Sequence, residues 1–529
     1  ACGGDLTVQG TAESPIKFEN NTACNGGAIY YAPAKNLSDG WGSANIQYVN
    51  FIGNKAEKAS GETRAETAIQ NGGAIYNECY SVTNCITQIN NCVFDGNSAS
   101  QGGAVLGSRC SVSDSEIKNN LTASHFSGAL HFYAANGIYR VKFIGNSNSV
   151  LLLSCDGTAT IEDCEFSEND CTGGALMSLF GNTTIKGSTF QKNKAKLMIC
   201  VGNSESSSIY TTTLKNCSIV NNEFECLYET YARNPDMKFM MYGGTIKDNY
   251  FSNGLARHSS TNSLEVTLTC GLNAEGELNT SDRLVISNNK SRHLVYATDR
   301  ITYKLGYVSF AYNTSGISRV YSDSTTYTDK QLDIDSAGVM TVEGGNINFL
   351  APIRISQNKG PRGGLLAVTS GEASLNASSV EEYVDSHNVD ESGKGAMFYV
   401  GGSGKLNVTG INIKDQALTG VGLFYVDKGG ELNLGSTEKE TLMYNSHGTT
   451  GLIYVLGTAN LINVRMVSCG TTTSSYGPIY VGGSGVANVT GISTTYTING
   501  STKYANYGLY GGTITCGLVY DKDGNAVAN

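Results

Sequence analysis

Short apolar segments alternate with polar turns along the whole chain of 529 residues. The segments are rich in β-branched and aromatic residues, as in Lys405-Leu406-Asn407-Val408, and Gly and Asn punctuate them. This pattern is typical of short β-strands joined by turns, and it excludes a helical solenoid. No Leu-x-x-Leu-x-Leu ladder is present, which also excludes leucine-rich repeats.

A Phe-x-x-Asn motif recurs in the first part of the chain. Its seven copies are Phe18/Asn21, Phe51/Asn54, Phe94/Asn97, Phe143/Asn146, Phe166/Asn169, Phe190/Asn193 and Phe310/Asn313. Looser copies with Ile or Leu in the first position are Ile117/Asn120, Ile219/Asn222, Ile246/Asn249, Ile286/Asn289, Ile355/Asn358 and Leu442/Asn445. From Phe94 to Ile246, successive copies lie 23 to 29 residues apart.

Two further motifs repeat in the same way. Gly-Gly-Ala followed by an aliphatic residue begins at Gly26, Gly72, Gly102 and Gly173, and Ser127-Gly128-Ala129-Leu130 is a reduced copy. In the C-terminal part, Gly-x-x-Tyr-Val-like segments begin at Gly395, Gly422, Gly451 and Gly477.

A period of this length indicates a solenoid, and β-type segments make it a parallel β-helix. Parallel crossovers are right-handed, so we expect a right-handed parallel β-helix of roughly 20 coils of 23–30 residues, forming a rod on the order of 100 Å long. Residues 1–320 would carry the Gly-Gly-Ala and Phe-x-x-Asn coils with loop insertions. Residues 321–529 would continue the β-helix with the longer Tyr-Val coils.

Each motif has a physical role in such a coil. Phe at one phase would stack into an interior ladder of rings, and Asn three residues later would sit at a turn, tolerate left-handed backbone and stack its amide into a hydrogen-bonded ladder. Gly-Gly lets the chain bend sharply, and Ala leaves room for the neighbouring rings.

The pairing of Gly-Gly-Ala-Ile with Phe-x-x-Asn resembles the repeats of the polymorphic outer-membrane proteins, a family of chlamydial surface autotransporters. Similar repeats are found in surface proteins of other microbes. The motifs that carry the resemblance lie between Phe18 and Asn313. The resemblance implies a surface-exposed β-helical passenger with adhesive or structural duties.

The net charge of −10 and the isoelectric point near 5.2 argue against a nucleic-acid partner, which would need a basic surface. No apolar run approaches the length of a membrane-spanning helix. The chain opens Ala1-Cys2-Gly3 without Met, so we expect a secreted, extracellular or cell-surface protein whose signal peptide has been removed.

Fifteen cysteines fit a secreted protein, and neither they nor the six histidines have metal-ligand spacing, so we expect no metal or cofactor. Cys79 and Cys85 are close enough in sequence to close a local disulfide. Cys2 and Cys516 are candidates for a bond between successive subunits. Other cysteines share the inward phase of the motifs, and they are either small buried core residues or disulfides between stacked coils.

Twelve Asn-x-Ser/Thr sequons are candidate N-glycosylation sites in a eukaryotic secretory pathway, although chance predicts about as many. They are Asn20, Asn36, Asn120, Asn182, Asn216, Asn279, Asn289, Asn313, Asn376, Asn407, Asn488 and Asn499.

The sequence favours a non-catalytic protein. A pectin-type hydrolase needs clustered Asp pairs, and the chain contains no Asp-Asp. The densest acidic patch, around Glu162-Asp163, alternates like a solvated strand face. The tyrosine-rich segment from Tyr321 to Tyr327 has two interpretations, half-buried strand residues or a surface that stacks on carbohydrate or docks protein.

We therefore expect an extracellular, non-catalytic structural protein, a rigid rod that stacks head to tail on itself into a filament. The alternative is an adhesin that binds host receptors or glycans through loops such as residues 33–44 and 55–70. A second alternative is a polysaccharide lyase.

Overall fold

A computed structural model describes the chain over the following residues: 5–32, 42–58, 70–78, 86–123, 127–134, 137–202, 209–230, 237–258, 263–323, 326–332, 334, 337–376, 380–382, 389–390, 397–414, 422–439, 441–444, 446–448, 451–467, 469–471, 478–490, 493–498, 501–503, 508–510, 513–516, 519–520 and 526–527.

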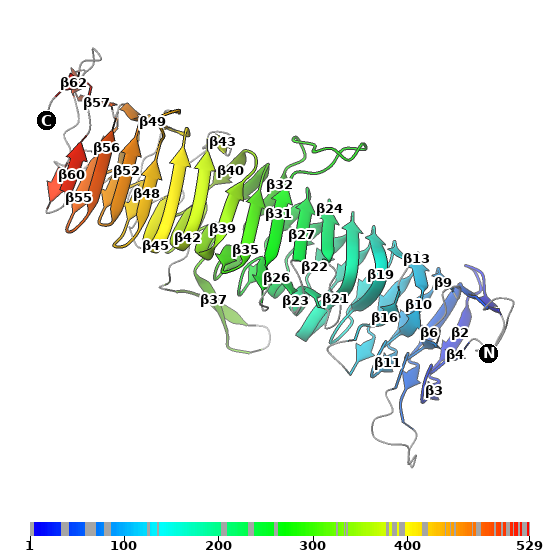
Figure 1. Cartoon of the computed structure of the whole chain (residues 1–529). Coiled ribbons are helices and arrows are strands. Elements are labelled where there is room, and N and C mark those ends of the chain that lie inside the picture. The colour runs from blue at the N-terminus through cyan, green and yellow to red at the C-terminus, as the bar shows by residue number, and fades with distance from the viewer. Residues whose placement is uncertain are drawn as a thin grey trace. The chain divides into compact units, whose positions relative to one another are not determined.

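The chain folds into two compact units. Unit 1 contains residues 1–245 and 257–262, and unit 2 contains residues 246–256 and 263–529. The described residues of both units form β-strands and turns without any helix, and nearly all strand pairs are parallel. Strands that are successive in space belong to successive coils, which confirms the predicted parallel β-helix (Figure 1). The change of motif predicted at residue 320 falls within unit 2.

Unit 1 is built from three faces of parallel strands. The narrow sheet contains β2 (Ile16–Glu19), β6 (Val49–Ile52), β10 (Val93–Asp95), β14 (Glu116–Lys118), β18 (Lys142–Ile144), β20 (Glu165–Ser167), β22 (Thr189–Gln191) and β25 (Ser218–Val220). A short sheet contains β3 (Thr22–Ala23), β7 (Lys55–Ala56), β11 (Ser98–Ala99) and β15 (Leu121–Thr122). The broad sheet contains β1 (Leu6–Gln9), β4 (Ile29–Tyr31), β5 (Ala44–Gln47), β8 (Ile75–Asn77), β9 (Thr87–Asn90), β12 (Val105–Ser108), β13 (Cys110–Ser113), β16 (Leu130–Tyr133), β17 (Gly137–Tyr139), β19 (Leu151–Glu162), β21 (Asp170–Lys186), β23 (Lys194–Val201), β24 (Thr211–Lys215), β26 (Glu223–Thr230) and β27 (Met237–Tyr242).

Unit 2 repeats the arrangement. Its narrow sheet contains β32 (Leu284–Ser287), β36 (Val308–Ala311), β40 (Ile353–Ser356) and β43 (Val380–Glu382). Its broad sheet contains β29 (Tyr250–Phe251), β31 (Leu264–Thr269), β33 (Lys290–Ser291), β34 (Val295–Thr298), β35 (Ile301–Leu305), β39 (Met340–Phe349), β42 (Leu366–Asn376), β45 (Phe398–Thr409), β47 (Phe424–Val426), β48 (Glu431–Leu434), β51 (Ile453–Val455), β52 (Thr458–Ile462), β55 (Ile479–Gly482), β56 (Val486–Thr490), β59 (Gly508–Tyr510) and β60 (Thr513–Cys516).

The remaining strands are short or form small sheets. Among them, β28 (Thr245–Lys247) belongs to the narrow sheet and β30 (Ala256–His258) to the broad sheet. The small sheets contain β37 (Ile317–Tyr321), β38 (Tyr327–Gln331), β41 (Lys359–Gly360), β44 (Val389–Asp390), β46 (Asn412–Lys414), β49 (Thr441–Tyr444), β50 (His447–Gly448), β53 (Val464–Val467), β54 (Gly470–Thr471), β57 (Ser493–Ile498), β58 (Ser501–Lys503), β61 (Val519–Tyr520) and β62 (Ala526–Val527).

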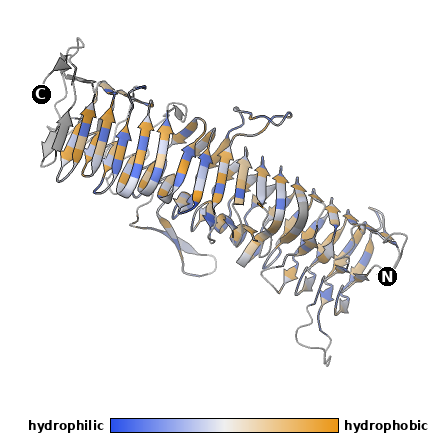
Figure 2. Ribbon diagram, viewed as in Figure 1, coloured by the Kyte–Doolittle hydropathy of each residue, from blue (hydrophilic) through white to orange (hydrophobic). Residues whose placement is uncertain are grey.

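The core of each unit lies inside the coils. Because side chains alternate across a strand, every second residue points inward and stacks on its equivalent in the next coil. Ile46, Ile89 and Val112 form one such column and are fully buried. The apolar and polar bands along the strands follow the same alternation (Figure 2).

The Gly-Gly-Ala motif forms a corner where neighbouring coils touch. Gly72 adopts a φ of +65°, which favours glycine. A Cβ on Gly73 would lie 1.9 Å from the carbonyl oxygen of Gly103 in the next coil, so no side chain fits there. Ala74 is fully buried. The two glycines thus have separate roles, one in the bend and one in close coil packing.

Candidate functional site

The phenylalanines of the Phe-x-x-Asn motif lie in one column of the narrow sheet of unit 1. Parallel register pairs Phe18 with Phe51 and Phe51 with Phe94, and their rings stack at centroid distances of 5.3 and 4.8 Å. Ile117 takes the next place in the column and interrupts the stack. Stacking resumes in the following coils, at 4.6 Å between Phe143 and Phe166 and at 4.8 Å between Phe166 and Phe190. Phe310, in unit 2, stands between Ile286 and Ile355 in the equivalent column.

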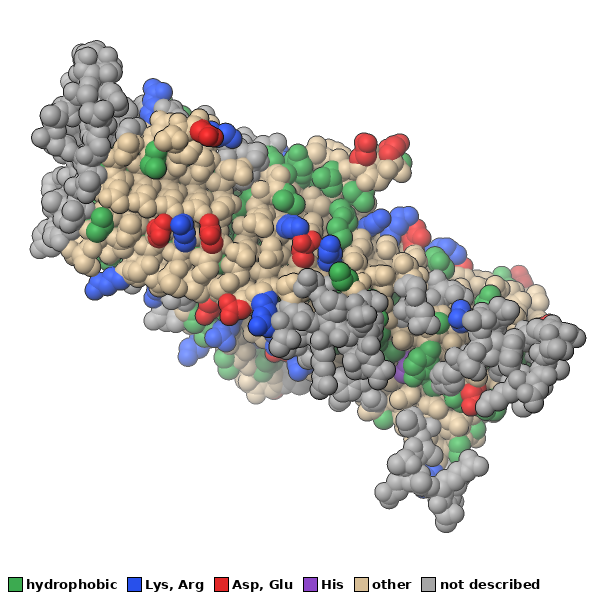
Figure 3. Space-filling view, in the orientation of Figure 1, with side chains coloured by type: hydrophobic (Ala, Val, Ile, Leu, Met, Phe, Trp, Pro, Cys, Tyr) green, Lys and Arg blue, Asp and Glu red, His purple; other side chains and the backbone are tan. Residues whose placement is uncertain are grey.

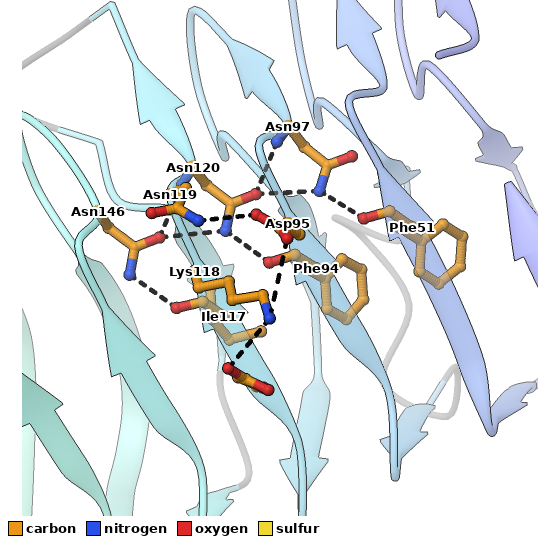
Figure 4. Close-up of polar contacts among 10 residues, drawn as sticks. Phe51, Phe94, Asp95, Asn97, Ile117, Lys118, Asn119, Asn120 and Asn146 are labelled. Carbon is orange, nitrogen blue, oxygen red and sulfur yellow. Dashed lines mark hydrogen bonds and ion pairs between the residues drawn. The ribbon is translucent and has the colours of Figure 1, made fainter. Parts of the chain in front are cut away.

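The motif asparagines form a buried hydrogen-bonded ladder beside this stack (Figure 4). The backbone N and the Nδ2 of Asn97 both donate to Oδ1 of Asn120, at 2.9 and 3.0 Å. Nδ2 of Asn97 also donates to the carbonyl oxygen of Phe51 at 3.0 Å. The side-chain amide of Asn97 also accepts two hydrogen bonds from Asn54, so it accepts two and donates two without water, which satisfies a buried polar group.

Each unit contains such a ladder. In unit 1 it joins Asn21, Asn54, Asn97, Asn120, Asn146, Asn169, Asn193 and Asn222. In unit 2 it joins Asn249, Asn289, Asn313 and Asn358. Asn445 lies outside the described residues. The looser Ile-x-x-Asn copies within these two runs thus contribute to the ladder in the same way as the Phe copies.

The left-handed turn residue is the one before each ladder asparagine, and this corrects the assignment of that conformation to the asparagine itself. Gly53 and Gly96 precede Asn54 and Asn97 with φ of +62° and +67°. Where the motif lacks glycine, other residues adopt the same conformation, as Lys192 does with a φ of +53°. The asparagine is thereby free to point its amide along the stack.

A second pair of ladders runs on the outer side of unit 2 and was not predicted. Tyr399, Tyr425, Tyr454 and Tyr480 occupy one register column opposite the inward Phe and Ile residues, and their rings stack at 6.0, 5.0 and 4.5 Å. An outer asparagine ladder joins Asn407, Asn433, Asn460 and Asn488, with one side-chain hydrogen bond of 2.8 Å at each step. Over β42, β45 and β48 the outer face carries alternating acidic and basic side chains, including a Lys405–Glu431 ion pair at 3.2 Å (Figure 3).

An antiparallel hairpin leaves the coils of unit 2. Its strands are β37 and β38, and it projects from the β-helix (Figure 1). Arg319 fixes its base, because the guanidinium lies 4.2 Å from the ring centroid of Tyr250 and 3.7 Å from that of Tyr327. Asp329 holds the same guanidinium at 3.2 Å and also binds Lys290 at 2.7 Å.

The outer part of the hairpin exposes three large apolar residues. Val320, Tyr321 and Tyr327 are 50%, 37% and 44% exposed, and the two tyrosine rings meet edge to face at 5.7 Å. These residues delimit the tyrosine-rich segment that the sequence left open between strand and docking surface. Tyr321 ends β37 and Tyr327 begins β38, so both are strand residues with partly exposed rings. Whether they also form a docking surface stays a prediction.

Comparison with known families identifies the coils. The model of the Chlamydia polymorphic membrane protein repeat matches residues 15–32 and 91–108. Each match contains one Phe-x-x-Asn and one Gly-Gly-Ala motif. The chain resembles the Chlamydia polymorphic membrane proteins. No curated protein matches the chain.

Eight described cysteines are free thiols, and they are Cys92, Cys110, Cys164, Cys171, Cys200, Cys217, Cys226 and Cys270. Cys92, Cys164 and Cys217 are buried, and each Sγ lies near backbone carbonyls of its own or a neighbouring coil. Burial raises the pKa of Cys92 and Cys164 to about 11, so both thiols stay protonated. The described structure thus favours small core residues over disulfides between coils.

The two predicted disulfides involve positions outside the described part of the structure. Cys2, Cys79 and Cys85 lie outside the described residues, as does the side chain of Cys516.

The sequons divide into buried and accessible sites. Asn120, Asn289 and Asn313 belong to the inner ladder and are at most 1% exposed, so the folded chain leaves no room for a glycan on them. Asn36 and Asn499 lie outside the described residues. The others are half-buried or exposed, and they are Asn20, Asn182, Asn216, Asn279, Asn376, Asn407 and Asn488.

The described residues contain no group of three or more His, Cys, Asp or Glu side chains that could hold a metal ion. In the acidic patch, Glu162 pairs with Lys186 at 2.6 Å and Glu168 pairs with Lys192 at 3.2 Å. Most of these side chains are largely exposed, which fits a solvated strand face. No helix in the described part of the chain is long and apolar enough to cross a membrane.

Proposed function

We propose that the protein is a non-catalytic surface protein of adhesin type, whose β-helix carries a binding hairpin. The match to the Chlamydia polymorphic membrane protein repeat supports a place at the cell surface. The inner ladders support a scaffold role, because fully bonded amides and stacked rings hold each coil in register with the next.

The hairpin is the observation that supports a binding role most directly. Val320, Tyr321 and Tyr327 lie together and are exposed, and a contiguous exposed apolar patch is typical of an interaction site. Aromatic residues held on a rigid base are typical anchors of protein interfaces, and they also stack on sugar rings. Arg319 supplies that base through its contacts with Tyr250 and Asp329.

Surface display is tested with antibodies raised against the folded chain. Labelling of intact, unpermeabilised cells of the source organism is expected. Labelling that requires permeabilisation contradicts the proposal.

Adhesion is tested with beads coated with the purified chain and incubated with cultured host cells. We expect the host cells to retain few of the beads that carry the triple variant Val320→Ser, Tyr321→Ser and Tyr327→Ser. Tyr312→Ser is the matched control, because Tyr312 is 55% exposed but lies outside the hairpin. Equal retention by the triple variant and the control contradicts the role of the hairpin.

End-to-end assembly is a second candidate. In the described residues, β2 pairs with β6 alone, Phe18 is only half-buried and Asn21 is exposed, so this edge of both ladders offers the bonding groups that the inner coils satisfy. Negative-stain images at rising concentration are expected to contain filaments. Monomers alone at high concentration contradict assembly.

A further inference from the structure

A polar cavity lies on unit 2 at the foot of the hairpin. Its volume is about 540 Å³, and β34, β39 and β42 contribute to its lining. Arg292 and His293, which precede β34, line it as well. A hydrogen bond connects the start of the hairpin to the cavity lining, because the backbone N of Gly316 donates to the carbonyl oxygen of Arg292 at 2.9 Å.

His293 is the most constrained group of the cavity. It is only 9% exposed, and its Nδ1 has no hydrogen-bond partner among the described residues. Its ring stacks on that of Tyr296 at 4.1 Å with an interplanar angle of 10°. Burial lowers the pKa of His293 to about 4, so the ring is neutral at physiological pH and offers one donor and one acceptor. A buried nitrogen without a partner is unfavourable, and a ligand hydroxyl would satisfy it.

The rest of the lining is also rich in hydrogen-bonding groups. The phenol of Tyr296 donates to the carboxylate of Glu343, and burial raises the pKa of that phenol, which keeps it protonated. Thr369 and Ser370 add hydroxyl groups. Arg292 and Glu343 are exposed at the cavity and carry opposite charges, so the described lining has no net charge.

We propose that this cavity binds a neutral saccharide of one or two rings. Its volume lies within the roughly 300–1,000 Å³ of small-molecule sites. Its lining supplies both hydrogen-bond donors and acceptors, which suits a ligand that is covered with hydroxyl groups, and the balanced charges of Arg292 and Glu343 favour a neutral sugar over an anionic one. The inference rests on the proposed surface function and deepens it by naming a ligand class.

The test uses the full chain on an array of neutral and acidic glycans, followed by calorimetric titration with the free sugar that binds best. His293→Phe keeps the ring on Tyr296 but removes both nitrogens. We expect this variant to lose at least tenfold in affinity while its melting temperature stays equal or rises, because an unpartnered buried nitrogen is removed. Glu343→Gln is expected to weaken binding, and Glu168→Gln in unit 1 is the charge-matched control with unchanged affinity.

The inference is overturned when no neutral glycan binds, when acidic glycans alone bind, or when His293→Phe binds as tightly as the parent chain. Its failure is distinguishable from failure of the proposed function. Adhesion of beads through the hairpin without any sugar binding would contradict only the saccharide site in the cavity. Sugar binding in a chain that never reaches the cell surface would remove only the adhesin role.

Discussion

The same residue type forms two different ladders in the two regions of the molecule. In unit 1, Oδ1 of Asn169 accepts from the backbone N and Nδ2 of Asn146 at 2.9 and 3.0 Å, and only 1% of Asn169 is exposed. In the C-terminal coils of unit 2, Asn460 is half-buried and makes one side-chain hydrogen bond to each neighbouring coil. Water can replace the hydrogen-bond partners of Asn460 but not those of Asn169. The hydrogen bonds of Asn169 are therefore expected to contribute more to the free energy of unfolding.

The aromatic columns differ in the same sense. Phe166 stacks inside the coils of unit 1 and is fully buried. Tyr454 stacks outside the coils of unit 2 and is half-buried. The inner rings therefore fill the coil itself. The tyrosine column packs outside a coil whose interior is already filled by Phe398, Phe424 and the aliphatic residues that follow them, although Tyr399, Tyr425 and Tyr480 are at most 8% exposed.

The largest expected effect is from removal of an inner ring. Phe166→Ala is expected to destabilise unit 1 by about 4 kcal/mol, because the cavity left between Phe143 and Phe190 cannot collapse against stacked coils. Tyr454→Ala should lower stability by only about 1–2 kcal/mol. Urea unfolding combined with hydrogen exchange of the flanking strands measures both. Equal losses at the two positions would contradict the contrast.

Acid is expected to weaken both regions, since the described residues of each include a buried neutral histidine. Burial lowers the pKa of His131 and of His293 from the ordinary 6.5 to about 4. The unfolded chain binds protons first as pH falls, so stability present above pH 6.5 is lost between pH 6.5 and 4, on the order of 3 kcal/mol for each histidine.

His131→Leu separates the two contributions. The register neighbours of His131 are Leu106 and Leu152, so leucine fits the column. We expect the variant to lose the acid sensitivity of unit 1 and to keep that of unit 2, as measured by thermal unfolding and hydrogen exchange from pH 7.5 to 4. An unchanged pH profile of unit 1 would show that another group dominates.

Asparagine substitutions compare the ladders directly. Asn169→Ala removes the acceptor of two donors of Asn146, which remain buried, and is expected to destabilise unit 1 by about 2–3 kcal/mol. Asn460→Ala should change stability by about 0.5 kcal/mol, because its neighbours can bond to water. The urea midpoints of the two variants test the difference, which disappears if the outer ladder is as important as the inner one.

The smallest expected effect on stability concerns the left-handed residue that precedes a ladder asparagine. Lys192 is left-handed at +53° and exposed, so Lys192→Gly should stabilise unit 1 by up to about 1 kcal/mol despite losing the exposed pair with Glu168. Gln191→Gly, one residue earlier in β22, is the control and should destabilise. A loss of stability in Lys192→Gly would contradict the turn assignment.

The sequence was sufficient for the coil and for its inner ladder. Phe, Asn and Gly-Gly recur at a fixed phase, and a fixed phase in a solenoid means stacking, so positions such as Phe94 and Asn97 could be placed from the pattern. The left-handed residue was misassigned because the third motif position varies among Gly96, Glu168 and Lys192 and leaves no repeated signal.

The outer features were harder to predict for a different reason. Asn407 and Asn433 stand in visible strand segments, but alternation alone does not say that their amides bond from coil to coil. The cavity near His293 combines residues from 292 to 402, which coil stacking brings together, and no local motif marks it.

The ladder passes the hairpin without interruption. Oδ1 of Asn358 accepts from the backbone N of Asn313 at 3.0 Å across 45 residues, as Oδ1 of Asn313 accepts from Asn289 at 3.1 Å across 24. The number of residues between two ladder asparagines therefore does not change the hydrogen bond that joins them. Such a scaffold lets evolution, or a protein engineer, exchange one excursion for another while the coils on either side stay in place.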